Sequence, residues 1–162
     1  LQPGPGVGGH CIAVDPWFIV SSAPEEAKLI TLSRKINDKK PNFVMKKIIE
    51  AMDKIEKSSQ EITVATLGLS FKPDIDDLRE SPALLIAERI SRLEFQKHLI
   101  VEPNIEKLPE GLQKNGVFLV DIETALEESD LLVLLVDHKE FFSIEKSSLE
   151  NKIVIDTKGI IR

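Results

Sequence analysis

Hydrophobic positions recur with two different periods along the chain. Between residues 23 and 58 they return largely every third or fourth residue, which is the period of one face of an amphipathic helix. Pro41 lies inside this run, and because proline lacks a backbone donor we expect a kink, or two helices that meet near it. A helix of this kind packs on a partner, which is either the rest of the chain or a second copy of it. The repeating apolar residues are Leu29, Ile30, Leu32, Ile36, Phe43, Val44, Ile48, Ile49, Met52 and Ile55.

From Glu61 onward, short apolar runs alternate with helical stretches. Ser81 and Pro82 are typical of the first turn of a helix, and a further helix is expected over residues 122–128. Strands that alternate with helices predict an α/β fold, in which a helical linker precedes a Rossmann-like parallel sheet with helices on both faces. The runs rich in aliphatic and β-branched residues predict strands at residues 62–69, 98–102, 117–120, 131–137 and 153–156.

Two lysines follow predicted strands directly. Ligands of open α/β sheets bind beyond the carboxyl ends of the strands, so Lys72 and Lys158 are expected at one edge of the sheet, where two ammonium groups suit a diphosphate. Residues 68–73, which follow the first strand, lack the GxGxxG pattern that brings a helix N-terminus close to a pyrophosphate. We therefore expect that this sheet does not hold NAD in the usual way, and that Glu102 at the end of the second strand is structural.

Composition narrows the class of protein. The 162 residues are 42% hydrophobic and 30% charged, which is typical of a globular domain, and the formal charge of -6 argues against non-specific nucleic-acid binding. No apolar run approaches the roughly 18 to 20 residues of a membrane-spanning helix, and the first residues lack the features of a signal peptide. We expect a cytoplasmic protein with no membrane partner. Because the chain begins at Leu1 in a Gly- and Pro-rich stretch, we also expect a piece of a longer protein.

The single cysteine, Cys11, follows a glycine-rich stretch. One cysteine forms no internal disulfide and no multi-cysteine metal site, so it is either buried filler or a reactive thiol. Glycines directly before it let backbone N–H groups approach a bound oxygen or phosphate, and such donors also stabilise a thiolate. Residues 1 to about 20 are expected to form a loop, and Asp15 would lie one helical turn from the sulfur if residues 12–16 begin a helix.

Three stretches carry a resemblance to a known family. The first resembles the GxGGxCxxxD catalytic motif of the UDP-glucose/GDP-mannose dehydrogenase family, which it matches at Gly6, Gly8, Gly9, Cys11 and Asp15. Residues 68–82 resemble that family's C-terminal UDP-binding signature, and residues 156–159 resemble its last strand and loop. His10 and residues 12–18 are most similar to the branch that acts on N-acetylated sugars, and within it to the members that oxidise UDP-N-acetylmannosamine.

The resemblance implies an enzyme that oxidises the C6 alcohol of a UDP-sugar to a carboxylate, with NAD as the oxidant in two successive steps. Cys11 would be the nucleophile and would form a thiohemiacetal and then a thioester with the sugar carbon, while Asp15 would assist by orienting the hydrolytic water. The remaining predicted site residues are Arg79, which would reach NAD, and those that would contact the UDP-sugar, namely Gly8, Phe71, Lys72 and Lys158.

The chain divides by composition into three segments. Residues 1–22 would form the catalytic cysteine loop and residues 59–162 the Rossmann-like UDP-sugar-binding domain, while the amphipathic pattern of residues 23–58 favours a central helical segment through which a homodimer forms. The family further needs an NAD-binding domain and a lysine acid/base before this loop, and neither is in this sequence. We therefore expect the chain alone to have no dehydrogenase activity.

Other interpretations stay open for several of these residues. Asp15 either assists catalysis or only caps a helix, and Arg79 either reaches NAD or pairs with acidic neighbours. His10 is expected to make hydrogen bonds within the loop, and Trp17 and Phe18 are expected in the core. For the whole chain, the alternatives are a dehydrogenase of UDP-N-acetylglucosamine or UDP-glucose, a UDP-sugar-binding or dimerisation module without catalysis, and a cysteine hydrolase.

Overall fold

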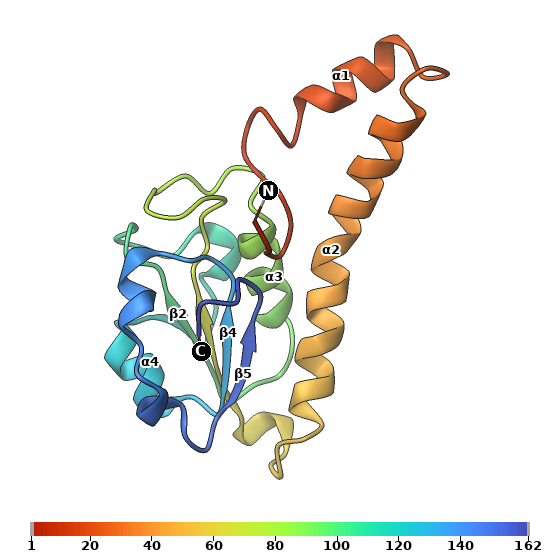
Figure 1. Ribbon diagram of the computed structural model, residues 1–162. Helices are drawn as coiled ribbons and strands as arrows, with labels where there is room; N and C mark the ends of the chain where they lie inside the picture. Colours follow the sequence, from red (N-terminus) through yellow and green to blue (C-terminus); the bar gives the residue numbers. More distant parts are fainter. Residues whose placement is uncertain (1, 162) are drawn as a thin grey trace.

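The computed structural model describes residues 2–161, so Leu1 and Arg162 lie outside the described part. A short helix, α1 (Asp15–Ser22), leads into a long helix, α2 (Lys28–Met52), which runs alongside the sheet domain and carries α1 at its far end (Figure 1). The order of helices before strands agrees with the predicted helical linker.

A five-stranded parallel sheet forms the centre of the remaining chain, with the strand order β3-β2-β1-β4-β5. The predicted α/β class is therefore confirmed, because every neighbouring pair of strands runs parallel and helices lie between the strands along the chain. The strands are β1 (Thr63–Leu67), β2 (Lys97–Val101), β3 (Val117–Leu119), β4 (Leu131–Leu134) and β5 (Ile153–Asp156). The helices between them are α3 (Pro82–Ile90) and α4 (Ile122–Glu128), with short 3-10 turns at Ser59–Glu61, Glu110–Leu112, Lys139–Ser143 and Lys146–Leu149.

Helices cover both faces of the sheet, as predicted. On one face α2 and α3 pack together against β1 and β4, with Ile48 and Ile86 completely buried between them. On the other face α4 contributes Ala125, which packs on Leu67 and Leu134 (Figure 1). Because both faces are covered, the strands are apolar on both sides, which is why they appear in the sequence as continuous hydrophobic runs and not as alternating ones.

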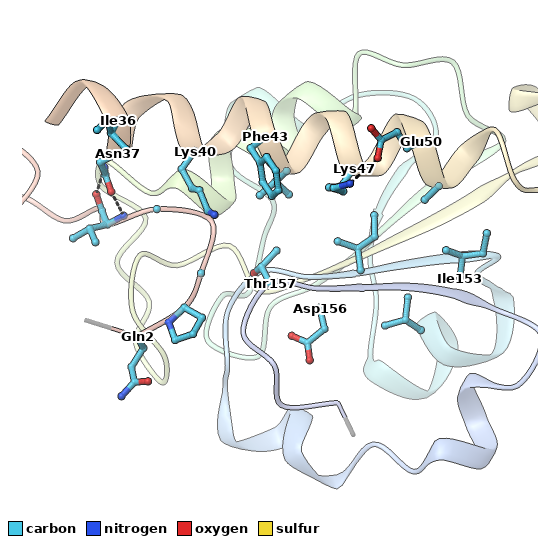
Figure 2. Close-up of a pocket in the computed structure, with 18 of the residues that line it drawn as sticks. Gln2, Ile36, Asn37, Lys40, Phe43, Lys47, Glu50, Ile153, Asp156 and Thr157 are labelled. Carbon is cyan, nitrogen blue, oxygen red and sulfur yellow. Dashed lines mark hydrogen bonds and ion pairs between the residues drawn. The ribbon is translucent and has the colours of Figure 1, made fainter. Parts of the chain in front are cut away.

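Pro41 does not divide the central helix, so the prediction of two helices that meet there is wrong. Proline removes the hydrogen bond that the carbonyl of Asn37 would accept. That carbonyl faces Gly6, at 3.6 Å from the position a Cβ would take. The side chain of Asn37 meanwhile exchanges two hydrogen bonds with the backbone of Val7, at 2.8 and 3.0 Å (Figure 2). The glycine-rich loop therefore packs against the point at which the helix lacks a hydrogen bond.

The first segment differs from its prediction in two ways. Residues 15–22, for which a loop was expected, form α1, because Pro16 suits a first helical turn and no breaker follows it before Ser22. Trp17 and Phe18 are exposed and not in the core, because α1 extends beyond the sheet domain and packs on α2 (Figure 1). Among residues 2–161, no helix has the length and apolar character that crossing a membrane requires.

Candidate active site

The cysteine loop packs against the loop that connects β1 to α3. A Cβ on Gly8 would collide with the backbone carbonyl of Glu80, so only glycine allows this approach. Gly9 has a φ of +95°, and a Cβ there would lie 2.8 Å from a ring carbon of Phe71. Two glycines of the predicted motif thus allow the backbone to come close to the predicted UDP-binding signature, although residues 9 and 71 are far apart in sequence.

Cys11 is a free, exposed thiol, so the interpretation as buried filler is wrong. Its backbone carbonyl accepts hydrogen bonds from the N–H groups of Val14 at 3.0 Å and Asp15 at 2.8 Å. These bonds form one helical turn that leads into α1, which confirms the predicted spacing for the backbone. Both Cys11 and Asp15 are exposed, and both are therefore accessible to a ligand at this edge of the domain.

Arg79 and Asp77 form a charged pair beside the cysteine. The guanidinium donates to both carboxylate oxygens, with its shortest hydrogen bond at 2.6 Å from Nη2 to Oδ2. These hydrogen bonds lower the pKa of Asp77 to about 2, and the same carboxylate, followed by the nearby Cys11, raises the pKa of Arg79. His10 also faces this pair, with Nδ1 at 3.8 Å from Asp77 Oδ2 and its ring edge-on to Phe71. The salt bridge expected as the alternative role of Arg79 is therefore present, next to the thiol.

The two predicted lysines lie beyond the carboxyl ends of parallel strands, at one edge of the sheet. Lys72 is exposed in the loop after β1. Lys158 follows β5, and its side chain, which is only 14% exposed, forms an ion pair with Asp137 at 2.9 Å. Its Nζ also lies 3.5 Å from the position a Cβ of Gly4 would take. The cysteine loop thus touches Lys158 at Gly4 and Phe71 at Gly9, so it spans the edge on which both lysines lie.

A buried polar cluster lies directly beneath this edge, and its histidine was missed as a site residue from sequence. Glu102 and His138 follow β2 and β4, and their side chains have no exposed surface. Burial by itself raises the pKa of Glu102, but hydrogen bonds from His138 and from the backbone of Leu69 and Asn104 leave this pKa below its ordinary value. This burial and these hydrogen bonds within the fold agree with the prediction that Glu102 is structural. A signal for His138 existed, because it is a polar residue two positions after the continuous apolar run of residues 131–136.

The residues after β1 do not fit a dinucleotide site of the usual kind. The chain leaves β1 at Leu67 and reaches the first residue of α3 only at Pro82, so no short glycine turn directs a helix N-terminus at a pyrophosphate. Glu102, which stands where a ribose-binding acid is found in such folds, is already bonded to the backbone of Leu69 and Ser70. Arg79 is therefore the one predicted contribution of this chain to NAD binding.

A groove of about 780 Å³ lies between α2 and β5. Lys40 and Phe43 point from α2 toward Thr157 at the end of β5, whereas Lys47 pairs with Glu50 on the helix itself (Figure 2). Neither Cys11 nor the loop at Phe71 and Lys72 lines this groove. The groove adjoins the edge that carries the predicted site, because Gly4 and Gly6 of the cysteine loop and the end of β5 line both.

Comparison with known proteins assigns the cysteine loop and the loop after β1 to two domains of one family. Residues 65–162 match the UDP-binding domain of the UDP-glucose/GDP-mannose dehydrogenase family, and residues 1–39 match the central domain of the same family. The chain belongs to this family. The dehydrogenase family's central and UDP-binding domains are thus both represented here, and the contact of Gly8 and Gly9 with residues 71–80 is a contact between them.

Related dehydrogenases match the whole chain but are much longer. UDP-N-acetyl-D-mannosamine dehydrogenase of Yersinia pestis is 49% identical over 166 residues, which is 100% of this chain and 39% of that protein. NDP-N-acetyl-D-galactosaminuronic acid dehydrogenase of Ralstonia nicotianae is also 49% identical, over 99% of this chain and 36% of that protein. The chain thus spans well under half the length of these relatives.

Solved structures of dehydrogenases show the same fold. The structure of UDP-D-ManNAc dehydrogenase from Pyrococcus horikoshii superposes with a TM-score of 0.82 at 33% identity, over 100% of this chain and 37% of that chain. UDP-N-acetyl-mannosamine dehydrogenase from Staphylococcus aureus superposes with a TM-score of 0.76 at 33% identity, over the same shares of the two chains.

Proposed function

We propose that this chain is the catalytic-cysteine and UDP-binding part of an NAD-dependent UDP-N-acetyl-D-mannosamine 6-dehydrogenase. The observation that carries the proposal is the exposed thiol of Cys11, held by a glycine loop that packs on Phe71 and lies beside Arg79. This arrangement brings a nucleophile to the ligand-binding edge of a domain that matches UDP-binding domains. A cytoplasmic location belongs to the same proposal.

Cys11 supplies the covalent step. Once the C6 alcohol has been oxidised to an aldehyde, the sulfur adds to the carbonyl carbon and gives a thiohemiacetal. Loss of hydride from that carbon gives a thioester, and water then displaces the sulfur to release the carboxylate and the free thiol. NAD is the hydride acceptor in both oxidations and is held mainly by sequence outside this chain. Asp15, one helical turn from Cys11, orients the hydrolytic water.

The loop after β1 and the end of β5 hold the nucleotide-sugar. Lys72 and Lys158 neutralise the diphosphate from two sides of the edge, since an ammonium group pairs with phosphate oxygens as a point charge. Gly8 and Phe71, which lie where the cysteine loop packs on the UDP-binding domain, contact the nucleotide-sugar, and Arg79 reaches toward NAD.

The test separates catalysis from binding in the whole dehydrogenase, in which the NAD-binding domain is present. Cys11→Ser is expected to abolish NADH production while leaving the affinity for UDP-sugar unchanged, because a hydroxyl is a poorer nucleophile for the thioester route. Full turnover of the Cys11→Ser enzyme would remove Cys11 from the mechanism. Absence of turnover in the unaltered enzyme, together with UDP-sugar binding, would favour a binding module without catalysis.

The identity of the sugar is tested by direct competition of substrates. N-acetylmannosamine is proposed because the residues around Cys11, His10 among them, resemble those of the branch that acts on this sugar. Sequence identity alone does not decide, because one relative named as a UDP-N-acetyl-D-mannosamine dehydrogenase and one named as an NDP-N-acetyl-D-galactosaminuronic acid dehydrogenase are both 49% identical. The whole enzyme should oxidise UDP-N-acetylmannosamine with a higher kcat/KM than UDP-N-acetylglucosamine or UDP-glucose. A higher kcat/KM for either alternative would reassign the substrate.

A homodimer through α2 completes the proposal. Beside its buried face, α2 exposes Leu29, Leu32, Ile36 and Phe43. These residues are separated by three, four and seven positions, so they form one stripe along the helix. A contiguous exposed apolar stripe is typical of an interaction surface.

A further inference from the structure

Two buried titratable side chains lie beneath the proposed UDP site and touch each other. Glu102 follows β2 and His138 follows β4, and Nε2 of the histidine lies 3.0 Å from Oε2 of the carboxylate. Neither side chain has any exposed surface, so neither can contact a substrate directly. Burying such groups is costly unless they are fully hydrogen-bonded, so the bonds they make indicate what the pair holds in place.

Glu102 fixes the beginning of the loop that leaves β1. Its Oε2 accepts hydrogen bonds from the backbone N–H of Leu69 at 2.7 Å and of Ser70 at 3.1 Å. Its other oxygen accepts from the backbone and side-chain nitrogens of Asn104, both at 3.2 Å. A carboxylate with this many donors is held in one orientation, and so are the two backbone N–H groups from which it accepts.

His138 fixes the far end of the same loop. Its Nδ1 accepts a hydrogen bond from the backbone N–H of Asp74 at 2.9 Å, and the side-chain amide of Asn104 lies 3.2 Å from the same nitrogen. A ring nitrogen that accepts carries no proton, so Nε2 carries it and donates to Glu102. Asp74 has a φ of +61°, in the left-handed region, which Asp adopts more readily than most residues other than glycine. The backbone N–H of Lys139 completes the hold by donating to Asp74 Oδ1 at 3.0 Å.

Between these two fixed points lie the residues proposed to contact the UDP-sugar. Phe71 and Lys72 come directly after Ser70, whose N–H donates to Glu102. Only Pro73 lies between Lys72 and Asp74, whose N–H donates to His138. The hydroxyl of Ser70 donates to the carbonyl of Lys72 at 2.7 Å, which restrains the loop from within. The exposed side chain of Lys72 therefore extends from a backbone that is held on both sides.

We propose that His138 and Glu102 are positioning residues for diphosphate binding, which hold the backbone of residues 69–74 so that Lys72 meets the phosphates without first being ordered. The inference rests on the proposed function, because it assigns a role at the same site. A loop that is already ordered binds its ligand more tightly than one that loses conformational entropy on binding. His138 acts through the N–H of Asp74, and Glu102 acts through the N–H groups of Leu69 and Ser70.

A pair of substitutions at His138 separates its two hydrogen bonds. In His138→Asn the amide oxygen stands where Nδ1 was and can still accept from Asp74, while the donor to Glu102 is lost. In His138→Gln the terminal amide reaches the Nε2 position and can still donate to Glu102, while the acceptor for Asp74 is lost. Both variants lose the ring and one hydrogen bond, so their unfolding temperatures should fall by similar amounts.

The binding of UDP, measured by calorimetry, is the readout. His138→Gln should bind UDP about five- to tenfold more weakly than the unaltered chain, and His138→Asn within about twofold of it. His98→Gln is the control, because His98 is equally buried and bonded to Thr66 at 2.8 Å but lies within β2, away from the loop. This control should lose stability and keep its UDP affinity. Hydrogen exchange of the Asp74 amide, followed by NMR, should accelerate in His138→Gln alone.

The UDP affinities of the three variants decide whether His138 positions the loop. Weaker UDP binding in His138→Gln, with near-normal binding in His138→Asn and His98→Gln, would establish the positioning role. Equal affinities in the two His138 variants, or an unchanged affinity in His138→Gln, would overturn it even though the unaltered chain binds UDP. Absence of UDP binding by the unaltered chain would overturn the proposed function, and this inference with it.

Discussion

Gly9 packs against the ring of Phe71, and the two residues define how the cysteine loop sits on the UDP-binding domain. A Cβ at Gly9 would lie 2.8 Å from the nearest ring carbon, and the φ of +95° is one that other L-residues rarely adopt. The position of Cys11, two residues later, therefore depends on an aromatic side chain of another domain. Any substitution that lifts the loop from Phe71 is expected to move the thiol.

Gly9→Ala tests this dependence. The added methyl group collides with Phe71 and also strains the backbone, so we expect a loss of about 2 to 3 kcal/mol in the free energy of unfolding. Gly116→Ala is the matched control, because Gly116 has a similar φ of +83° but its nearest neighbouring atom would be 3.9 Å from a Cβ. The control should lose only about 1 kcal/mol, the cost of backbone strain. Equal losses in the two variants, measured by chemical denaturation, would show that the contact with Phe71 is not tight.

Acid should weaken the fold through Glu102. The pKa of this carboxyl is lowered in the folded protein from its ordinary value of 4.5, so its contribution to stability is fully present above about pH 4.5. The contribution is lost as the pH falls through the lower folded pKa. Glu102→Gln should therefore cost about 2 to 3 kcal/mol near neutral pH and lose less stability than the unaltered chain below pH 4.5. Glu127→Gln, on the exposed part of α4, serves as the control and should follow the unaltered chain.

Local patterns account for what the sequence predicted correctly. Each predicted strand exists, with its ends within a few residues, because buried parallel strands are continuous apolar runs. The predicted cap of α3 is also present, since the hydroxyl of Ser81 accepts from the N–H of Leu84 at 3.3 Å. Of the predicted site, the structure brings the cysteine loop, at Gly8 and Gly9, against Glu80 and Phe71 of the loop that carries Arg79.

Contacts between distant residues account for the failures. Trp17 is apolar enough for a core, and nothing nearby in sequence indicates that α1 extends beyond the sheet domain. Pro41 predicts a break, and the loop at Gly6 that packs against the helix there comes from another part of the chain. His138 meets Glu102 because β2 and β4 lie on either side of β1 in the sheet. This neighbourhood is a property of strand order, which the sequence pattern does not report. Periodicity reports the exposed and buried faces of an element but does not identify its neighbours.

Lys158 has two roles that can be separated, because it is paired with Asp137 as well as proposed to bind phosphate. Lys158→Ala leaves a carboxylate that is only 23% exposed without its partner, so stability should fall by about 1 kcal/mol and UDP affinity by about tenfold. Adding Asp137→Asn removes the unpaired charge and should restore the stability but not the UDP affinity. Recovery of UDP affinity in the double variant would mean that Lys158 acts only through the fold.

The stripe of apolar residues on α2 predicts a dimer that a single charge would weaken. Ile36 lies in the middle of this stripe and is exposed, so Ile36→Glu would place a carboxylate inside the proposed interface without disturbing the buried face of the helix. Burying an unpaired charge is costly, and the dimer dissociation constant, measured by analytical ultracentrifugation, should rise at least about tenfold. Lys35→Glu is the control, because Lys35 is exposed next to the stripe but outside it, and this substitution changes the net charge more than Ile36→Glu does. It should leave the dissociation constant within about twofold. A monomeric unaltered protein, or equal effects of the two substitutions, would assign the stripe to some other contact.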